Sequence, residues 1–173
     1  VGEMHPDIQG FSLSDGRVME PFIGLLRSLR LILLTHSSEP VGHEYAGKGT
    51  VTPGALMDLI RQAQDVPIIC AHWGGGLPFY ALMPEVKAAL ENVYFDSAAS
   101  PFLYRPRVYP VAMQLVRPES VLFGSDYPLL NPSRIIRHIR TASITDDEKD
   151  AILGGNAQRL LGLGEHGTAV TDA

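Results

Sequence analysis

The sequence contains a single cysteine, Cys70, among its 173 residues, which excludes a disulfide within the chain. It has no apolar run approaching the roughly 18 to 20 residues of a membrane-spanning helix, and its first residues lack the basic and then apolar pattern of a signal peptide. Lys and Arg form no block that would track a phosphate backbone, and the formal net charge is -5. These absences predict a soluble, cytoplasmic protein with neither nucleic acid nor a membrane as its partner.

The hydrophobic content of 45% and the chain length are those of one compact domain with a sizeable core. Short apolar runs predict strands that end at Met4 and cover residues 31–34, 66–71, 92–95 and 120–123. Helical spacing of apolar residues predicts helices over residues 19–29, 52–63, 82–90, 108–116, 132–140, 145–153 and 156–163. The chain opens with VGEMHP, inside what reads as a strand and without an initiator Met, so we expect that a preceding segment has been removed.

Strands and helices therefore alternate, and successive strands lie roughly 25 to 35 residues apart, which is the spacing of βαβ crossover units. This order predicts a parallel sheet. Because the sequence lacks the GxGxxG turn of a dinucleotide-binding fold, five such units in series indicate part of a (β/α)8 TIM barrel. We expect one partial-barrel domain over residues 1–163 and a flexible tail over residues 164–173.

Polar side chains follow every predicted strand at the point where the strand ends. In chain order they are Glu3 with His5, His36, His72, Asp96 and Asp126. The carboxyl ends of parallel strands meet at one side of a sheet, so these residues should converge. Neutral imidazoles and an ionised carboxylate are ligands for a divalent metal and also serve as acid and base groups.

Five segments of the chain together carry a resemblance to a known family. They are LLTHSSEPVGHEYAGKG, IICAHWGGGLPFY, VYFDSAASP, VLFGSDYP and GGNAQRLLGL. In this order they resemble the carboxyl-terminal portion of the amidohydrolase-related family (amidohydrolase family 2). This family consists of metal-dependent TIM-barrel hydrolases and includes the aminocarboxymuconate-semialdehyde decarboxylase type.

The resemblance implies a role for three of the strand-end residues. His36 and His72 match the histidines after strands five and six of the barrel, and Asp126 matches the aspartate after strand eight. These three would be metal ligands, with Asp126 and His72 also catalytic, and residues 156–163 would form the closing helix. The family's HxH pair on strand one is absent from this sequence, so the chain corresponds to about strands four to eight.

Four further residues are candidates for substrate binding. The long loop over residues 37–52 contains His43 and Lys48, which can reach a substrate carboxylate, because loops of this length in compact domains usually form lids or binding segments. Arg105, after SPFLY, is a similar candidate for an anionic group. Trp73, next to His72, can stack on a substrate or cap the core.

The resemblance implies a metal-dependent hydrolase, in which water activated by a divalent metal, expected to be zinc, attacks a carbonyl-type carbon of a small molecule. Two alternatives stay open: a decarboxylase of an aromatic or muconate-like acid, and a non-catalytic half-barrel that acts as an assembly subunit. Five βα units cannot close a barrel, so strand edges and an apolar inner face stay open. We therefore expect a homo-oligomer, or pairing with an amino-terminal half-barrel.

Overall fold

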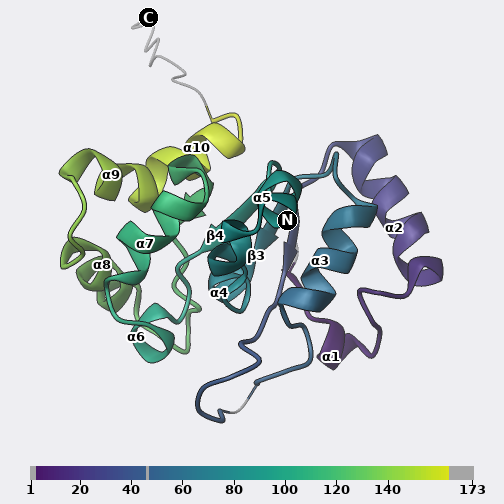
Figure 1. Ribbon diagram of the computed structural model, residues 1–173, viewed down its shortest axis with the longest axis horizontal. Helices are drawn as coiled ribbons and strands as arrows, with labels where there is room; N and C mark the ends of the chain where they lie inside the picture. Colours follow the sequence, from purple (N-terminus) through teal and green to yellow (C-terminus); the bar gives the residue numbers. More distant parts are fainter. Residues whose placement is uncertain (1–2, 46, 164–173) are drawn as a thin grey trace, which may run out of the picture.

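Figure 1 shows the computed structural model, which describes residues 3–45 and 47–163. The strands are β1 (Glu3–Met4), β2 (Leu33–Thr35), β3 (Ile68–Cys70), β4 (Val93–Asp96) and β5 (Val121–Leu122). The helices and helical turns are α1 (Pro6–Gln9), α2 (Gly16–Leu29), α3 (Pro53–Gln62), α4 (Ala71–Gly74), η1 (Leu77–Leu82), α5 (Pro84–Ala89), α6 (Ser100–Leu103), α7 (Val108–Leu115), η2 (Pro118–Ser120), α8 (Pro132–Arg140), α9 (Asp146–Asp150), η3 (Ala151–Gly155) and α10 (Asn156–Leu160). The tail predicted over residues 164–173 lies outside the described residues.

The five strands form one sheet in the order β1-β2-β3-β4-β5, and every neighbouring pair is parallel. Helical segments separate all successive strands, so each connection is a crossover. In Figure 1, α2 and α3 lie to one side of the sheet and α6 to α9 lie to the other. The structure confirms the predicted fold, a partial (β/α)8 TIM barrel.

The two faces of the sheet differ in burial. Leu33, Ile68 and Val93 are almost completely buried and belong to the same apolar core as Leu56 of α3. On the alternate positions, Leu34, Ile69 and Tyr94 stand opposite one another in register, and they are only partly buried. This partly covered apolar row is the open inner face expected of an incomplete barrel.

Helix α2 carries apolar residues on two of its faces. Met19, Ile23 and Leu26 are buried against the domain, and the carboxylate of Asp15 accepts a hydrogen bond from the backbone N–H of Arg17 at the start of the helix. A second set shares another face at spacings of four, three and four residues, and all its members are exposed: Val18, Phe22, Leu25 and Leu29.

None of the described helices is long and apolar enough to cross a membrane.

The carboxyl-terminal helices are tied to the sheet by capping and by one buried amide. Thr145 and Glu148 form the reciprocal capping box that their spacing indicates, and α9 then passes into the π-helical turn η3 and not into one continuous helix. The carboxamide of Asn156 donates to the carbonyls of Pro118 and Val121 at 2.9 and 2.7 Å. Helix α10 is thereby fixed to the start of β5, in the closing position that the resemblance implies.

After β3 the chain makes a left-handed turn in which five consecutive residues, 72–76, have positive φ. The turn passes close to two other segments: a Cβ atom at Gly74 would lie 3.0 Å from the Phe95 ring, and one at Gly75 would overlap the carbonyl of Ser38. The glycines are required here because only a residue without Cβ permits both the left-handed backbone and this approach.

Gly75→Ala is therefore expected to lower the free energy of unfolding by about 2 kcal/mol, through strain and overlap with backbone atoms. The matched control is Gly24→Ala in α2, at an exposed position where a Cβ meets nothing within 4 Å. That substitution should raise the free energy of unfolding by about 0.5–1 kcal/mol. Urea unfolding followed by circular dichroism measures both, and equal effects of the two variants would contradict this account.

Candidate functional site

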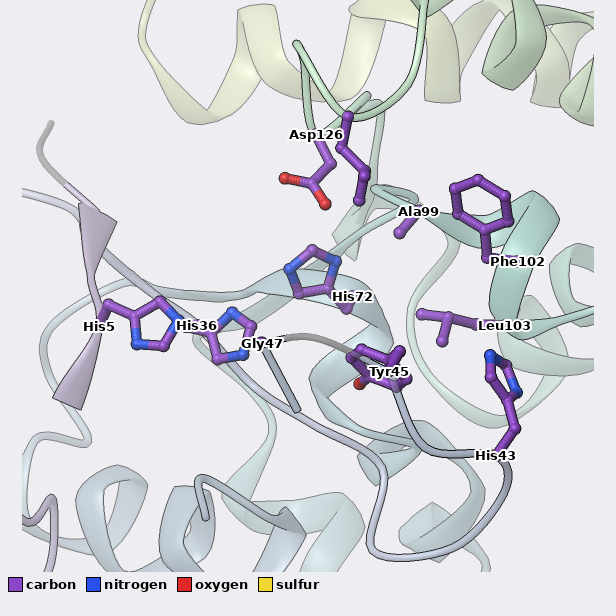
Figure 2. Close-up of a pocket in the computed structure, with 11 residues that line it drawn as sticks. His5, His36, His43, Tyr45, Gly47, His72, Ala99, Phe102, Leu103 and Asp126 are labelled. Carbon is purple, nitrogen blue, oxygen red and sulfur yellow. The ribbon is translucent and has the colours of Figure 1, made fainter. Parts of the chain in front are cut away.

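At the carboxyl ends of the strands lies a cavity of about 470 Å³, within the range of roughly 300–1,000 Å³ that is usual for small-molecule sites. Its polar end is formed by side chains from the segments that follow four different strands: His5, His36, His72 and Asp126 (Figure 2). The structure thus brings together His36, His72 and Asp126, the three residues that the resemblance assigns as metal ligands. It adds His5, which the sequence identified as a strand-end residue but did not include in the site.

The imidazole of His36 is held in its neutral form. Burial, followed by the neighbouring His72 and His5, lowers the pKa of His36 to about 4. Its Nε2 atom lies 3.1 Å from the hydroxyl of Ser38. An uncharged imidazole is the form that can act as a metal ligand or accept a proton.

His72 is placed by its backbone more than by its side chain. Its N–H donates to Asp96 Oδ1 at 2.9 Å, and the N–H of Ala98 donates to the same oxygen at 3.0 Å. Burial raises the pKa of Asp96. The Nδ1 atom of His72 is 3.4 Å from the Ala98 carbonyl, and a proton on Nδ1 leaves the lone pair of Nε2 free to bind.

His5 packs against His36 and does not point toward the same place. The two rings are stacked at 4.0 Å with an interplanar angle of 13°, whereas His36 and His72 meet edge to face at 5.1 Å. Lone pairs on parallel stacked rings cannot converge on one ion, but those of the edge-to-face pair can. The Nδ1 atom of His5 is buried without a hydrogen-bond partner among the described residues, so it is available to a ligand.

The donor types at this end of the cavity fit a divalent metal, with neutral imidazole nitrogens and a carboxylate. Within residues 3–45 and 47–163, no group of three or more His, Cys, Asp or Glu side chains is arranged to hold such an ion. The described residues therefore do not by themselves form a complete metal site, in line with the lack of an HxH pair in this sequence.

The opposite wall of the cavity is apolar. It consists of Ala99, Phe102 and Leu103 from the segment after β4, and Leu129 from the segment after β5. Figure 2 shows Ala99, Phe102 and Leu103 together, facing the histidines across the cavity. Such a cavity suits a flat ligand with charged or polar groups on one edge and carbon on the other. The sequence analysis did not predict this wall: Ala99, Phe102 and Leu103 have the spacing of one helix face, but α6 is only four residues long, and Leu129 lies in a separate segment.

The loop between β2 and α3 places some predicted substrate-binding residues at the cavity and others away from it. His43, Tyr45 and Gly47 line the cavity. Lys48 does not: its Nζ atom pairs with the Glu44 carboxylate at 2.9 Å and lies 3.4 Å from the His43 carbonyl. The lysine therefore pairs within its own loop and does not line the cavity in which it was expected to bind substrate.

Two further predicted substrate residues also lie elsewhere. The side chain of Trp73 is completely buried, its Nε1–H donates to the Ser100 hydroxyl at 2.7 Å, and its ring meets Tyr109 edge to face. It caps the core, and its left-handed backbone turns the ring away from the side that His72 faces. Arg105 is exposed and does not line the cavity.

Comparison with known proteins identifies the family of this chain. The model of the amidohydrolase family matches residues 2–163, which is nearly the whole chain. The chain belongs to the amidohydrolase family.

Among curated proteins, this amidohydrolase chain is 30% identical over 134 residues to a 6-methylsalicylic acid decarboxylase of Penicillium expansum, covering 64% of the chain and 40% of that protein. Among solved structures, it resembles a dihydroxybenzoic acid decarboxylase of Polaromonas with bound manganese and 2-nitroresorcinol (TM-score 0.72, 18% identity, 88% of this chain and 56% of that one). It also resembles a putative amidohydrolase of Staphylococcus aureus (TM-score 0.70, 19% identity, 93% and 64%). The chain thus spans about half the length of the relatives it matches.

The lowered pKa of His36 makes stability depend on pH in the metal-free protein. Between the ordinary value of 6.5 and about 4, the unfolded chain binds a proton that the folded chain does not, so the free energy of unfolding should fall as the pH drops through this window. His36→Gln should flatten the profile there, and His43→Gln, on the exposed loop, serves as the control. Urea unfolding in the presence of a chelator tests this, and an unchanged slope in His36→Gln would contradict it.

Proposed function

We propose that this chain forms the catalytic half of a metal-dependent decarboxylase that acts on an aromatic acid. The observation that carries the proposal is the division of the cavity into an end with His36, His72 and Asp126 and an apolar wall with Phe102 and Leu103. The 6-methylsalicylic acid decarboxylase relative and the dihydroxybenzoic acid decarboxylase fold neighbour support a lyase over the hydrolase that the sequence favoured.

A divalent cation is part of this proposal. His36, His72 and Asp126 are the residues that would hold it, together with donors outside the described residues. When bound, it supplies positive charge that attracts the substrate's carboxylate and neutralises charge developing on oxygen. Zinc was the expectation from sequence and manganese occurs in the Polaromonas structure, so metal analysis has to decide between them.

The chain's own side chains have three tasks in the proposed reaction. Asp126 delivers a proton to the ring carbon that carries the carboxylate, and the carbon–carbon bond then breaks, its electron pair returns to the ring and carbon dioxide leaves. His72, whose backbone N–H is fixed by Asp96 and whose Nδ1 lies near the Ala98 carbonyl, would hold the cation with Nε2. Phe102 and Leu103 hold the ring and exclude water from the reacting carbon.

Purified protein supplied with zinc or manganese should release carbon dioxide from a hydroxybenzoic acid. Asp126→Asn should lower the rate at least about 100-fold, because it removes the proton carrier. Asp147→Asn, at the exposed start of α9, is the control for a lost carboxylate. Hydrolysis of an ester or amide without any decarboxylation would show that the protein is a hydrolase. Full activity of Asp126→Asn would show that Asp126 is not the proton donor.

A second candidate, the non-catalytic assembly subunit, is favoured by the absence of a three-residue metal cluster from the described residues. Metal content distinguishes the two candidates. Zinc or manganese that copurifies, or that binds in calorimetry and is lost in His36→Gln, supports the enzyme, whereas protein that binds neither ion supports the subunit.

We also propose that the open side of the domain pairs with a further half-barrel or a second copy of the chain. Among the described residues, β1 is an edge strand paired with β2 alone, and the exposed apolar face of α2 follows it in sequence. An unpaired parallel edge beside an apolar helix face is the surface on which a further βα unit packs in a barrel.

The chain on its own should therefore self-associate, and Phe22→Gln with Leu25→Gln on the exposed face of α2 should reduce its mass in solution. Val41→Gln, which is more exposed but lies on the loop after β2, should leave the mass unchanged. Size exclusion with light scattering measures both. A monomeric parent protein would contradict pairing between two copies of the chain.

A further inference from the structure

The loop between β2 and α3 has a polar arrangement that the proposed decarboxylation does not use. Tyr45 lines the cavity, and its hydroxyl donates to Glu39 Oε2 at 3.0 Å. Figure 2 shows Tyr45 and His43 on the side of the cavity away from Asp126. This wall is the part of the site that meets the end of a ligand remote from the proposed catalytic groups.

The loop is held in place by hydrogen bonds at its two ends. The Ser38 hydroxyl accepts from the N–H of Gly49, and the Ser38 N–H donates to the Val51 carbonyl. The Asp7 carboxylate accepts from both the N–H and the hydroxyl of Thr50, which ties the loop to α1. The two ends of the loop that carries Tyr45 are therefore fixed by hydrogen bonds within the protein.

The hydroxyl of Tyr45 has a single hydrogen, which it donates in the hydrogen bond to Glu39. Burial, followed by the charge of Glu39, raises the pKa of Tyr45 to about 12, so the phenol stays neutral. What Tyr45 can still offer to a ligand is the acceptor capacity of its oxygen. A ligand hydroxyl can donate to this oxygen, but a carboxylate, which only accepts, cannot.

Glu39 adds a negative charge behind the same wall. In the described part of the chain its carboxylate forms no ion pair, and its Oε1 atom is buried without a hydrogen-bond partner. Tyr104 also feels this charge, because burial and then Glu39 raise its pKa. A second anionic group brought to this wall would be repelled, and more strongly than in water because the surroundings are partly buried.

We propose that Tyr45 selects substrates with a ring hydroxyl remote from the carboxylate, and that Glu39 is the positioning residue that leaves the Tyr45 oxygen able only to accept. This inference rests on the proposed function for the orientation of the acid, with its carboxylate toward His36 and His72. It assigns to the loop a preference for hydroxylated monoacids over diacids.

Three ligands that differ only in the group opposite the carboxylate test the inference: 4-hydroxybenzoate, benzoate and benzene-1,4-dicarboxylate. Calorimetry with the metal-loaded protein should rank them in that order of affinity. Tyr45→Phe keeps the ring and should weaken 4-hydroxybenzoate roughly three- to tenfold, to the level of benzoate, while benzoate itself is unchanged. Glu39→Gln keeps an acceptor for the Tyr45 hydroxyl, removes the charge and should tighten the diacid several-fold.

Glu44→Gln is the matched control, since it removes an exposed carboxylate of the same loop that pairs with Lys48 and should leave the ranking unchanged. Equal weakening of 4-hydroxybenzoate and benzoate in Tyr45→Phe would overturn the proposal, as would failure of the parent protein to prefer 4-hydroxybenzoate. Carbon dioxide release is measured separately. Ranked binding without decarboxylation would remove the proposed reaction but keep the role of Tyr45.

Discussion

The two hydrogen bonds that one oxygen of Asp96 accepts, from the backbone N–H groups of His72 and Ala98, fix the geometry on which the site depends. They join the ends of β3 and β4, at a point where His72 and Trp73 adopt left-handed backbone conformations that cost roughly 1–2 kcal/mol for each residue. A chain that followed β3 without this anchor would relax to an ordinary turn. The imidazole of His72 would then no longer meet His36 edge to face, and Trp73 would leave the core.

The rest of the site extends this constraint outward. The glycines after Trp73 let the turn pass beneath Ser38, and Ser38 in turn contacts His36 and closes the loop through Gly49. Two histidine segments and the loop that covers them thus share one set of backbone contacts. His36, His72 and the covering loop are consequently positioned together, while Asp126 and the apolar wall come from the segments after β4 and β5.

Sequence reasoning reached the fold and the polar end of the site because both depend on regular patterns. Alternating apolar runs predict parallel strands, and the strand ends then place His36, His72 and Asp126 on one side whatever the details of the loops. Sequence reasoning failed where the direction of a side chain depends on the local backbone conformation. Trp73 follows a ligand candidate in sequence, yet with its positive φ its side chain lies in the core. Lys48 and Tyr45 lie three residues apart in an irregular loop, and no periodicity tells which one faces the cavity.

The place of His5 couples the chemistry of the site to an edge strand of the sheet. Strand β1 has two residues and one neighbour, and it is joined to the β2 side by the bond from the His36 N–H to the Met4 carbonyl. Local opening of such an edge requires less free energy than opening of the central β3. Each opening event removes the ring stacked on His36 and hydrates an imidazole that is otherwise kept neutral by burial. The rate of amide hydrogen exchange in β1 therefore reports how often the buried imidazole of His36 becomes exposed to water.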